Sequence, residues 1–593
     1  MTSSKPSRLK LTESQNRRFG LIHKLFLVTF SVLLVRSVSI HLFPASSESL
    51  QKIAAKQYQT NIKLAPYRGS IFDRRGHALA ISTKRDSFYV NPRVFSPTKK
   101  QQRALSKILK IPYKKLELIK KKRTYFSWLK RKTLDTLSAE KIKKLKIKGL
   151  HRVSEPARFY PFGGVAANII GTTGIDNKGL LGIESQFEKE LHGDDDKFSS
   201  NRDAKGQPIF QNSSFALPEQ PGQDITLTID LAIQEIAEKA LESGLKKANT
   251  TKGFALVSDP FSGKILALAT LPKFDPNNTK TITGKNSRNP ALVDSFEPGS
   301  IVKPLVVAEA LEQKLIKESD QFDCQKGILA RDNWRIRDTH PHEDLTPEGI
   351  LIKSSNIGVF KIAELLQKRG LYQTYKKFGI GGQFQMIGFP GQVTGLLSKW
   401  STWSDLRFAN ISFGQGFKAT ALELVAAYGA IANGGKLLRP YLVDHLKSAD
   451  GQVTHDSNTH VLGQILSPET TEKLKNALFN VVEIGTGQKA KLDLYTAGGK
   501  TGTTEKFDPI KKAYSKTLRI ASFLGFAPVD APHLVIYVVV DEPQNKPYYG
   551  GKWAAPIFKE IAAKTLKYLN VPPDRLGRQN SAIVKGVLSG TSM

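Results

Sequence analysis

FEPGSIVKP, residues 296–304, joins a break in the chain to the start of a long apolar run. The Pro-Gly pair interrupts regular structure, and residues 301–311 then have the composition of a buried helix. This pattern puts Ser300 at the helix N-terminus and Lys303 one turn further on, on the same face. A serine hydroxyl becomes a good nucleophile when a base takes its proton, and a buried lysine with a lowered pKa can be that base. Ser300 and Lys303 are therefore a candidate nucleophile and base.

Such a pair carries little weight alone, because other serines also have a lysine three residues later; they include Ser96, Ser127 and Ser243. A second element is Lys353-Ser354-Ser355-Asn356, where the Ser354 hydroxyl and the Asn356 amide can point into one groove from a tight turn. The hydroxyl can relay a proton, and the amide can bind a peptide carbonyl. Ser199-Ser200-Asn201 repeats this spacing in a segment of loop composition, and we interpret it as solvated.

The third element is Gly498-Gly499-Lys500-Thr501-Gly502-Thr503. In a strand, Thr501 and Thr503 share one face, and Gly502 leaves room for a ligand or a backbone to lie close. Two hydroxyls beside the Lys500 ammonium suit a carboxylate. The backbone amide of Thr503, paired with that of Ser300, is a candidate oxyanion donor.

In this order the three elements match the signature shared by β-lactamases and penicillin-binding proteins. From about residue 60 to residue 570 the chain resembles the class B penicillin-binding proteins, and most of all the division-specific transpeptidases of the FtsI type. Ile301 and Thr504 depart from the residues common in that branch, and neither change removes a catalytic group. The pieces that resemble the family's N-terminal pedestal signature are Arg68-Gly69, Asp73-Arg74, Gly76, Arg158, Tyr160-Pro161, Gly171, Gly174, Gly179-Leu180, Gly182-Ile183-Glu184 and Arg202-Asp203.

The resemblance implies a mechanism for peptidoglycan crosslinking without a metal or organic cofactor. Ser300 would attack the carbonyl between the two terminal D-alanines of a stem peptide while Lys303 accepts the proton. Ser354, supported by Lys500, would pass a proton to the leaving D-alanine, and Asn356 would hold the donor peptide. The terminal carboxylate, or its mimic in a β-lactam inhibitor, would be bound by Thr501, Gly502 and Thr503.

The resemblance also implies membrane partners, namely a glycan polymerase of the FtsW type and other division proteins. Alternative interpretations are a β-lactamase or penicillin-sensing protein of the same fold, and a non-catalytic division scaffold. A metal site at Asp338, His340, His342 and Glu343 is a weaker hypothesis than a solvated polar loop, because no regular spacing orders these side chains.

The formal net charge of +35 favours anionic partners, but no zinc-finger spacing, RNA-binding signature or phosphate loop points to nucleic acid. Cys324 is the only cysteine, which excludes an intrachain disulfide. Basic residues precede an apolar stretch at 19–43, which predicts a cytoplasmic tail at 1–18 and a single transmembrane helix, with the rest of the chain outside. With the family resemblance, this implies the inner membrane, with the catalytic part on the outer, periplasmic side. A cleaved signal peptide is the alternative, with Pro44-Ala45-Ser46-Ser47 as its cleavage region.

The fold class predicted for the whole chain is multi-domain α/β. After the membrane helix we expect an elongated α+β pedestal at 44–220, a transpeptidase domain at 221–570 and a mobile C-terminal tail at 571–593. The transpeptidase domain should have a central antiparallel sheet flanked by helices, as in β-lactamases. Further predicted elements are a helical segment at 44–67, small basic amphipathic helices within 97–150, a strand at 225–229, a helix at 233–245, a hairpin at 254–268, strands at 521–527 and 534–540, and a helix at 556–569.

Overall fold

The computed structural model describes residues 12–42, 59–64, 66–122, 124, 126–134, 136–193, 196–201, 221–331, 333–382, 389, 391–508 and 513–575. The chain divides into two compact units. The first contains residues 1–64, 123–125 and 195–217, and the second contains residues 65–122, 126–194 and 218–593.

The first unit contains the membrane-helix candidate and one pair of strands. Helix α1 (Glu13–Leu42) is long and apolar enough to cross a membrane. Strand β1 (Gln59–Leu64) pairs antiparallel with β8 (Asp196–Asn201). The prediction of a helical segment at 44–67 was therefore wrong over Gln59–Leu64, and the rest of that range up to residue 58 lies outside the described residues. Ser199-Ser200-Asn201 lies in β8, so its interpretation as a loop was also wrong.

The second unit contains a five-stranded antiparallel sheet, in the order β11-β10-β24-β23-β22, that confirms the predicted central sheet. Strands that are far apart in the sequence meet in this sheet, because β24 lies between β10 and β23. The unbroken apolar runs of β10 and β24 are buried on both faces, as expected for central strands covered by helices on both sides. The bounds are β10 (Lys252–Ser258), β11 (Ile265–Leu271), β22 (Gly498–Asp508), β23 (Ala513–Ala527) and β24 (Leu534–Asp541).

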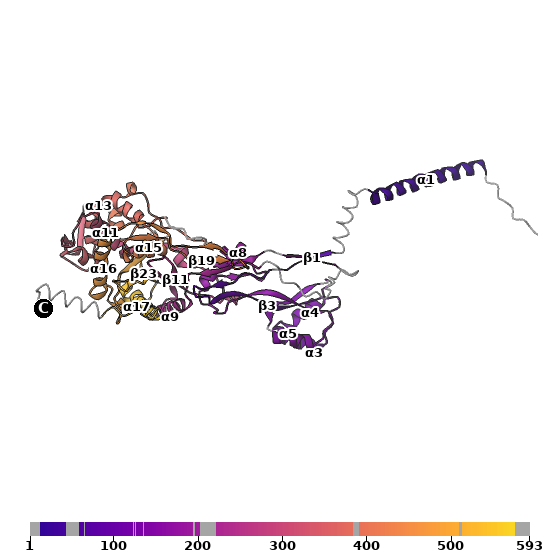
Figure 1. The fold of residues 1–593 in the computed structure, drawn as a ribbon, viewed down its shortest axis with the longest axis horizontal. Coiled ribbons are helices and arrows are strands. Elements are labelled where there is room, and N and C mark those ends of the chain that lie inside the picture. Colours follow the sequence, from indigo (N-terminus) through magenta and orange to yellow (C-terminus); the bar gives the residue numbers. More distant parts are fainter. Residues whose placement is uncertain are drawn as a thin grey trace, which may run out of the picture. The chain divides into compact units, whose positions relative to one another are not determined.

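Two helices, α9 (Leu231–Lys247) and α17 (Gly550–Tyr568), cover one face of this sheet (Figure 1). They approach closely at Gly244, where an added Cβ would lie 2.3 Å from the Ile557 side chain. α17 begins at Gly550, six residues before the predicted start at Pro556. The prediction placed proline at the first helical position, where its missing N–H costs nothing, but Pro556 lies inside the helix with its ring exposed.

The other face carries the larger hydrophobic core and most of the remaining helices. Helix α15 (Ala421–Ala432) is buried all round, as expected of a helix that is apolar on every side. The other elements of this layer are α10 (Pro290–Val293), η2 (Gly299–Val302), α11 (Lys303–Glu312), α12 (Pro347–Lys353), α13 (Asn356–Lys377), α14 (Asp405–Ser412), α16 (Pro468–Glu483) and the short strand pairs β12 (Ser295–Phe296) with β17 (Ala419–Thr420), β13 (Phe322–Asp323) with β16 (Asp344–Leu345), β14 (Ile328–Arg331) with β15 (Trp334–Arg337), and β18 (Lys436–Leu438) with β21 (Val461–Gln464).

A second, seven-stranded sheet joins strands from both sides of the predicted boundary near Pro221-Gly222. Strand β9 (Asp224–Leu227) pairs in parallel with β2 (Ile71–Phe72) and antiparallel with β19 (Val443–Lys447). The segment after the boundary therefore completes the sheet of the segment before it. The remaining strands are β3 (Ala78–Val90), β4 (Ser127–Leu134), β5 (Leu150–Phe159) and β20 (Val453–Asp456).

A buried ion network gathers several residues of the pedestal signature. The Arg68 guanidinium contacts Glu184 at 2.5 Å and Glu188 at 2.6 Å, and Arg158 contacts Glu184 at 2.6 Å. The Tyr160 hydroxyl donates to the same Glu184 carboxylate at 3.3 Å. A single buried carboxylate thus pairs with two buried arginines from distant parts of the sequence. Nearby elements are α6 (Ala167–Ile170), β6 (Thr172–Thr173), β7 (Gly179–Leu181), α7 (Gly182–Gln186) and α8 (Glu188–His192); Arg202-Asp203 lies outside the described residues.

The lysine-rich segment forms a small lobe with a core of its own. Its helices α3 (Lys99–Leu109), α4 (Tyr113–Lys120) and α5 (Thr136–Lys144) confirm the predicted amphipathic helices, and α3 starts with a capping box at Thr98 and Gln101. Strand β4 was not predicted, since its Lys and Arg residues hide the alternation that marks a strand. At the other end of the chain, Val571 is buried and Asp574 accepts a hydrogen bond from the Thr496 amide. The predicted tail therefore begins with residues that are packed on the fold.

Candidate active site

Ser300 lies in the short 3-10 turn η2, at the entrance to α11. The turn is fixed by its neighbours, because the Gly299 amide donates to the Gly414 carbonyl at 2.9 Å and the Tyr428 hydroxyl donates to the Ile301 carbonyl at 2.8 Å. Gly414 must lack a side chain, since an added Cβ would lie 2.0 Å from the Gly299 oxygen. Ile301 and its successors are buried while Ser300 is half-buried, so its side chain remains accessible.

Lys303 is fully buried, and its side chain leads to the second sequence element. Its Nζ donates to the Ser354 carbonyl at 2.6 Å and to the Asn356 Oδ1 at 2.7 Å, and lies 3.4 Å from the Ser354 Oγ. Burial lowers the pKa of Lys303 to about 7, while the Asp338 carboxylate opposes that shift. A substantial fraction of this amine is therefore neutral at physiological pH.

The turn from Ser354 to Asn356 joins α12 to α13 and is held by backbone geometry and by the half-buried Asp338. Ser354 ends α12 in the left-handed conformation, with φ of 60° and ψ of 41°, which costs a non-glycine residue energy and is typical of functional sites. Ser355 is the N-cap of α13 and accepts from the Gly358 amide at 2.9 Å. The Asp338 carboxylate accepts from the Ser355 hydroxyl and from the Asn356 amide, both at 2.5 Å.

Lys500 approaches the same serine from the edge strand β22. Its Nζ donates to the Ser354 Oγ at 2.9 Å and is also close to the carbonyl of Thr501, at 3.3 Å. Burial, together with repulsion by the Lys303 charge, lowers the pKa of Lys500 well below its ordinary value. The expected repulsion between the two lysines is therefore present, and it disfavours the state in which both amines are protonated.

The remaining residues of the third element line β22 beside η2 and the start of α17. Thr501 Oγ1 lies 2.9 Å from Thr486 Oγ1, and Thr503 Oγ1 accepts from the Gly550 amide at 3.1 Å. Gly502 is required for packing, because an added Cβ would lie 2.4 Å from the Ser522 Oγ and 2.9 Å from the Ile301 side chain. The close approach predicted at this glycine is therefore to the turn that carries Ser300.

The structure thus brings Lys303, Ser354, Asn356 and Lys500 into one hydrogen-bonded cluster and places the Ser300 turn against β22. The Ser300 hydroxyl forms no hydrogen bond with another described residue. The side-chain amide of Asn356 forms hydrogen bonds through both of its polar atoms. Its Oδ1 accepts from Lys303, and its Nδ2 donates to the Arg337 carbonyl at 2.8 Å. Its position therefore orients the Lys303 amine, and the second N–H of Nδ2 is left for the predicted contact with a peptide carbonyl.

Asp338 is the residue whose part in the site the sequence did not reveal. The sequence analysis considered it only as a member of a weak metal hypothesis, whereas its carboxylate accepts hydrogen bonds from the first residues of α13. No group of three or more potential metal ligands occurs among the residues that the structure describes. Its partners are 17 to 19 residues away in the sequence, without a spacing that would indicate the contact.

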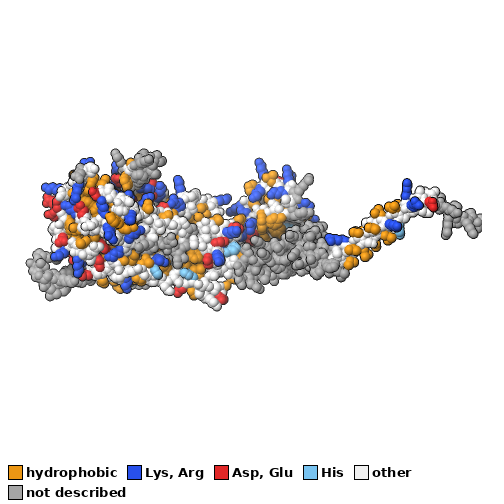
Figure 2. Space-filling view, turned by 90° about the horizontal axis from the view of Figure 1, so that it is seen from above, with side chains coloured by type: hydrophobic (Ala, Val, Ile, Leu, Met, Phe, Trp, Pro, Cys, Tyr) orange, Lys and Arg blue, Asp and Glu red, His pale blue; other side chains and the backbone are white. Residues whose placement is uncertain are grey.

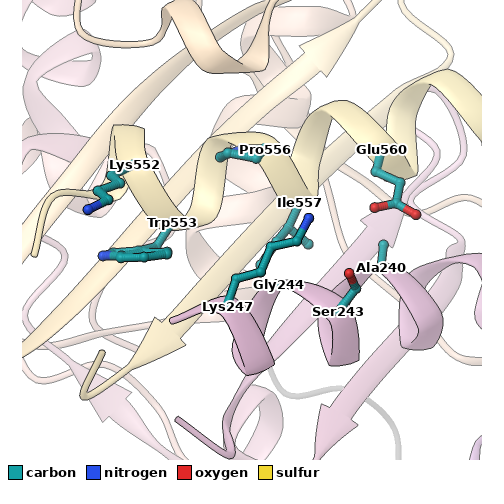
Figure 3. Close-up of a pocket in the computed structure, with 9 residues that line it drawn as sticks. All are labelled: Ala240, Ser243, Gly244, Lys247, Lys552, Trp553, Pro556, Ile557 and Glu560. Atoms are coloured by element: carbon teal, nitrogen blue, oxygen red, sulfur yellow. The ribbon is translucent and has the colours of Figure 1, made fainter. Parts of the chain in front are cut away.

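A separate cavity of about 90 Å³ lies between α9 and α17 (Figure 3). Trp553 and Lys552 lie toward one end of it and Glu560 toward the other (Figure 3). The Lys552 Nζ is 4.6 Å from the centroid of the Trp553 ring. None of the candidate site residues lines this cavity, so it is not part of the cluster around Ser354.

Comparison with known proteins places these observations in a family. Residues 253–563 match the family model of the penicillin-binding protein transpeptidase domain, and residues 63–227 match that of the penicillin-binding protein dimerisation domain. The turn that carries Ser300, the helix that carries Lys303 and the strand that carries Lys500 thus all lie in the matched transpeptidase domain. The chain belongs to the class B penicillin-binding proteins.

Several relatives cover nearly the whole chain. It is 31% identical to the probable peptidoglycan D,D-transpeptidase PenA of Neisseria meningitidis, over 96% of both chains. It is also 31% identical to the peptidoglycan D,D-transpeptidase FtsI of Escherichia coli K12, over 96% of this chain and 95% of that one. A solved structure of penicillin-binding protein 3 from Mycobacterium tuberculosis, complexed with aztreonam, is similar with a TM-score of 0.67 and 25% identity, over 86% of this chain and 98% of that one.

Proposed function

We propose that this protein is a peptidoglycan D,D-transpeptidase in which Ser300 forms the acyl-enzyme with a stem peptide. The observation that carries the proposal is the cluster in which Lys303 and Lys500, from different elements, both reach the Ser354 hydroxyl. Ser300 stands one helical turn before Lys303 and remains accessible. A nucleophile, a base and a proton relay are therefore available within one site.

The hydrogen bonds of Lys303 indicate how it acts as the base. A neutral amine has two donors and one lone pair, and the two short contacts to the Ser354 carbonyl and the Asn356 Oδ1 use both donors. The lone pair is then left to accept the Ser300 proton as its oxygen attacks the carbonyl carbon. Asn356 acts in this proposal as a positioning residue, because it holds the amine in the orientation that leaves the lone pair available.

The acylation step releases the terminal D-alanine. The Ser300 oxygen forms an ester as the peptide C–N bond breaks, and the leaving nitrogen takes a proton from the Ser354 hydroxyl. Lys303 or Lys500 restores that proton, since both contact Ser354. The amine of a neighbouring stem peptide then attacks the ester, forms the crosslink and returns the Ser300 hydroxyl. A β-lactam would acylate the same oxygen by opening its ring.

Substrate would be bound along the outer edge of β22, which is the edge strand of the five-stranded sheet. An extended peptide can add to such an edge through backbone hydrogen bonds. The hydroxyls of Thr501 and Thr503 would bind the terminal carboxylate. The Ser300 amide, in the first turn of η2, lacks an intrahelical acceptor and is suited to an oxyanion, together with the Thr503 amide.

We also infer where the enzyme works and with which partners. α1 would anchor it in the inner membrane as a single-pass protein, and Arg17 and Arg18 at the start of the helix favour a cytoplasmic N-terminus with the catalytic part on the periplasmic side. The similarity to FtsI proteins supports septal wall synthesis in cell division. A glycan polymerase of the FtsW type would supply the strands that this chain crosslinks.

Labelling with a fluorescent penicillin tests the proposal. The wild type should form a covalent adduct that survives denaturing electrophoresis, and Ser300→Ala should form none. Ser295→Ala, a substitution in β12 five residues away, is the matched control and should label like the wild type. Equal labelling of Ser300→Ala, or a wild-type chain that never labels, would end the proposal. An adduct that is hydrolysed rapidly would favour the β-lactamase alternative over a transpeptidase.

A further inference from the structure

The lysine-rich lobe is the most strongly charged part of the chain and has no part in the acyl-transfer site. Residues 97–150 contain 19 Lys and Arg against 3 Asp and Glu, a net charge of +16 within a total of +35. The lysines of α3, α4 and α5 have exposed side chains, and none of them forms a salt bridge with another described residue. A concentrated charge that is left without internal partners attracts anions.

Two helices of the lobe also expose a leucine within their rows of lysines. Leu118 of α4 is 64% exposed, with Lys114 one turn before it and Lys121 just after the helix. Leu137 of α5 is 75% exposed, and Lys141 follows it by one turn. Figure 2 shows Lys and Arg side chains around hydrophobic ones on this lobe, at the position along the horizontal axis where Figure 1 labels α3, α4 and α5.

Both features together fit an anionic lipid surface better than a soluble polyanion. Exposed leucines between lysines are the pattern of helices that lie in a membrane interface, where the apolar side chain enters the acyl boundary and the ammonium groups contact headgroups. A soluble polymer would use the charge but not the leucines. We propose that the lysine-rich lobe is a docking surface for anionic phospholipid headgroups, and that Leu118 and Leu137 insert between them.

The experiment uses the full chain, bound to vesicles through α1, with a polarity-sensitive fluorophore on Leu118→Cys. Native Cys324 is buried, so the introduced thiol is the accessible one. Leu365→Cys, at an exposed leucine of α13 whose neighbouring Lys361 and Lys368 are paired with Asp323 and Asp405, is the matched control site. Flotation with neutral phosphatidylcholine vesicles reports insertion of α1 separately, so a failure of the anchor is distinguished from a failure of the lobe.

The label at residue 118 should shift to the blue in vesicles with about 30% phosphatidylglycerol and not in neutral ones. About 0.5 M salt should abolish the shift, because the screening length then falls to a few ångströms. Adding Lys114→Glu and Lys121→Glu should remove the response, whereas Lys436→Glu with Lys447→Glu should not. All variants should still label with penicillin, since none of these side chains is in the site.

Three results would overturn the proposal. The first is equal emission in neutral and anionic vesicles, and the second is an anionic-lipid shift of the same size at residue 365. The third is a shift that polyglutamate produces in neutral vesicles and that anionic lipid does not, which would identify a soluble polyanion as the partner.

Discussion

Replacing Asp338 with asparagine should speed the acylation of Ser300 below neutral pH. The neutral form of Lys303 is the proposed base, so the rate should rise with pH through the pKa of about 7 that burial gives this lysine. The Asp338 carboxylate raises that pKa. Removing its charge should therefore lower the pKa, and the acid limb of the rate profile should move to lower pH.

The size of the effect follows from the fraction of neutral amine. At pH 6, a pKa of about 7 leaves roughly 9% of Lys303 neutral. Loss of a nearby opposite charge shifts a pKa by about one unit or more, and a pKa of about 6 would leave roughly half of it neutral. Asp338→Asn should therefore be acylated about fivefold faster than the wild type at pH 6. Above about pH 8.5 the two rates should be equal, because Lys303 is then neutral in both proteins.

The assay is the second-order rate constant for a fluorescent penicillin between about pH 5 and 9. Because Lys303 and Lys500 both contact Ser354, the midpoint describes the pair and not one residue. Glu560→Gln is the control, because it removes a carboxylate of α17 that pairs with Lys564 and contacts no residue of the Ser354 cluster. It should leave the midpoint unchanged.

Asp338→Ala separates the effect of the Asp338 charge from the effect of its hydrogen bonds. Asparagine can still accept the backbone hydrogen bonds at the start of α13, but alanine cannot. Asp338→Ala should therefore lose rate at every pH. An Asp338→Asn profile with the wild-type midpoint, or one that moves toward higher pH, would refute the assignment of Lys303 as the base.

Two further perturbations test the packing around the site and the pedestal. Glu184→Ala leaves two buried arginines without their counter-ion and should lower the free energy of unfolding by about 3–5 kcal/mol, whereas Glu560→Ala breaks an exposed pair and should cost about 0–1 kcal/mol; equal urea midpoints for the two would contradict this. Gly502→Ala places a methyl group 2.4 Å from the Ser522 Oγ and 2.9 Å from Ile301, and at about 1–3 kcal/mol of overpacking it should slow penicillin acylation at least about fivefold. A normal acylation rate with this variant would show that β22 and the Ser300 turn can separate freely.

The sequence predicted the elements whose signal is local. The hairpin of β10 and β11, the strands β23 and β24, and helix α9 are apolar runs with clear periodicity, and the structure confirms them. The three candidate catalytic elements were found because their residue types occur in the order of the shared signature, and the structure brings Lys303 and Lys500 into contact with Ser354. The roles of Thr501 and Thr503 toward substrate stay predictions.

The sequence could not predict features that depend on a distant partner. β1 is polar and short, and it is a strand because β8, far along the chain, supplies its hydrogen bonds. Asp338 was grouped with nearby histidines, although its carboxylate serves the start of α13. The contacts of the Asn356 side-chain amide with Lys303 and Arg337 were not predicted either, and its role toward a peptide stays a prediction. None of these pairings has a periodicity that a single sequence reveals.

The position of β9 has a consequence for the independence of the two halves of the chain. Because it lies between β2 and β19, a cut at residue 220 would expose an unpaired strand edge on the half that keeps β2 and another on the half that keeps β9. Open edges of this kind template pairing with other molecules. Neither fragment should remain monodisperse in isolation, and each half therefore serves as the other's protection against self-association.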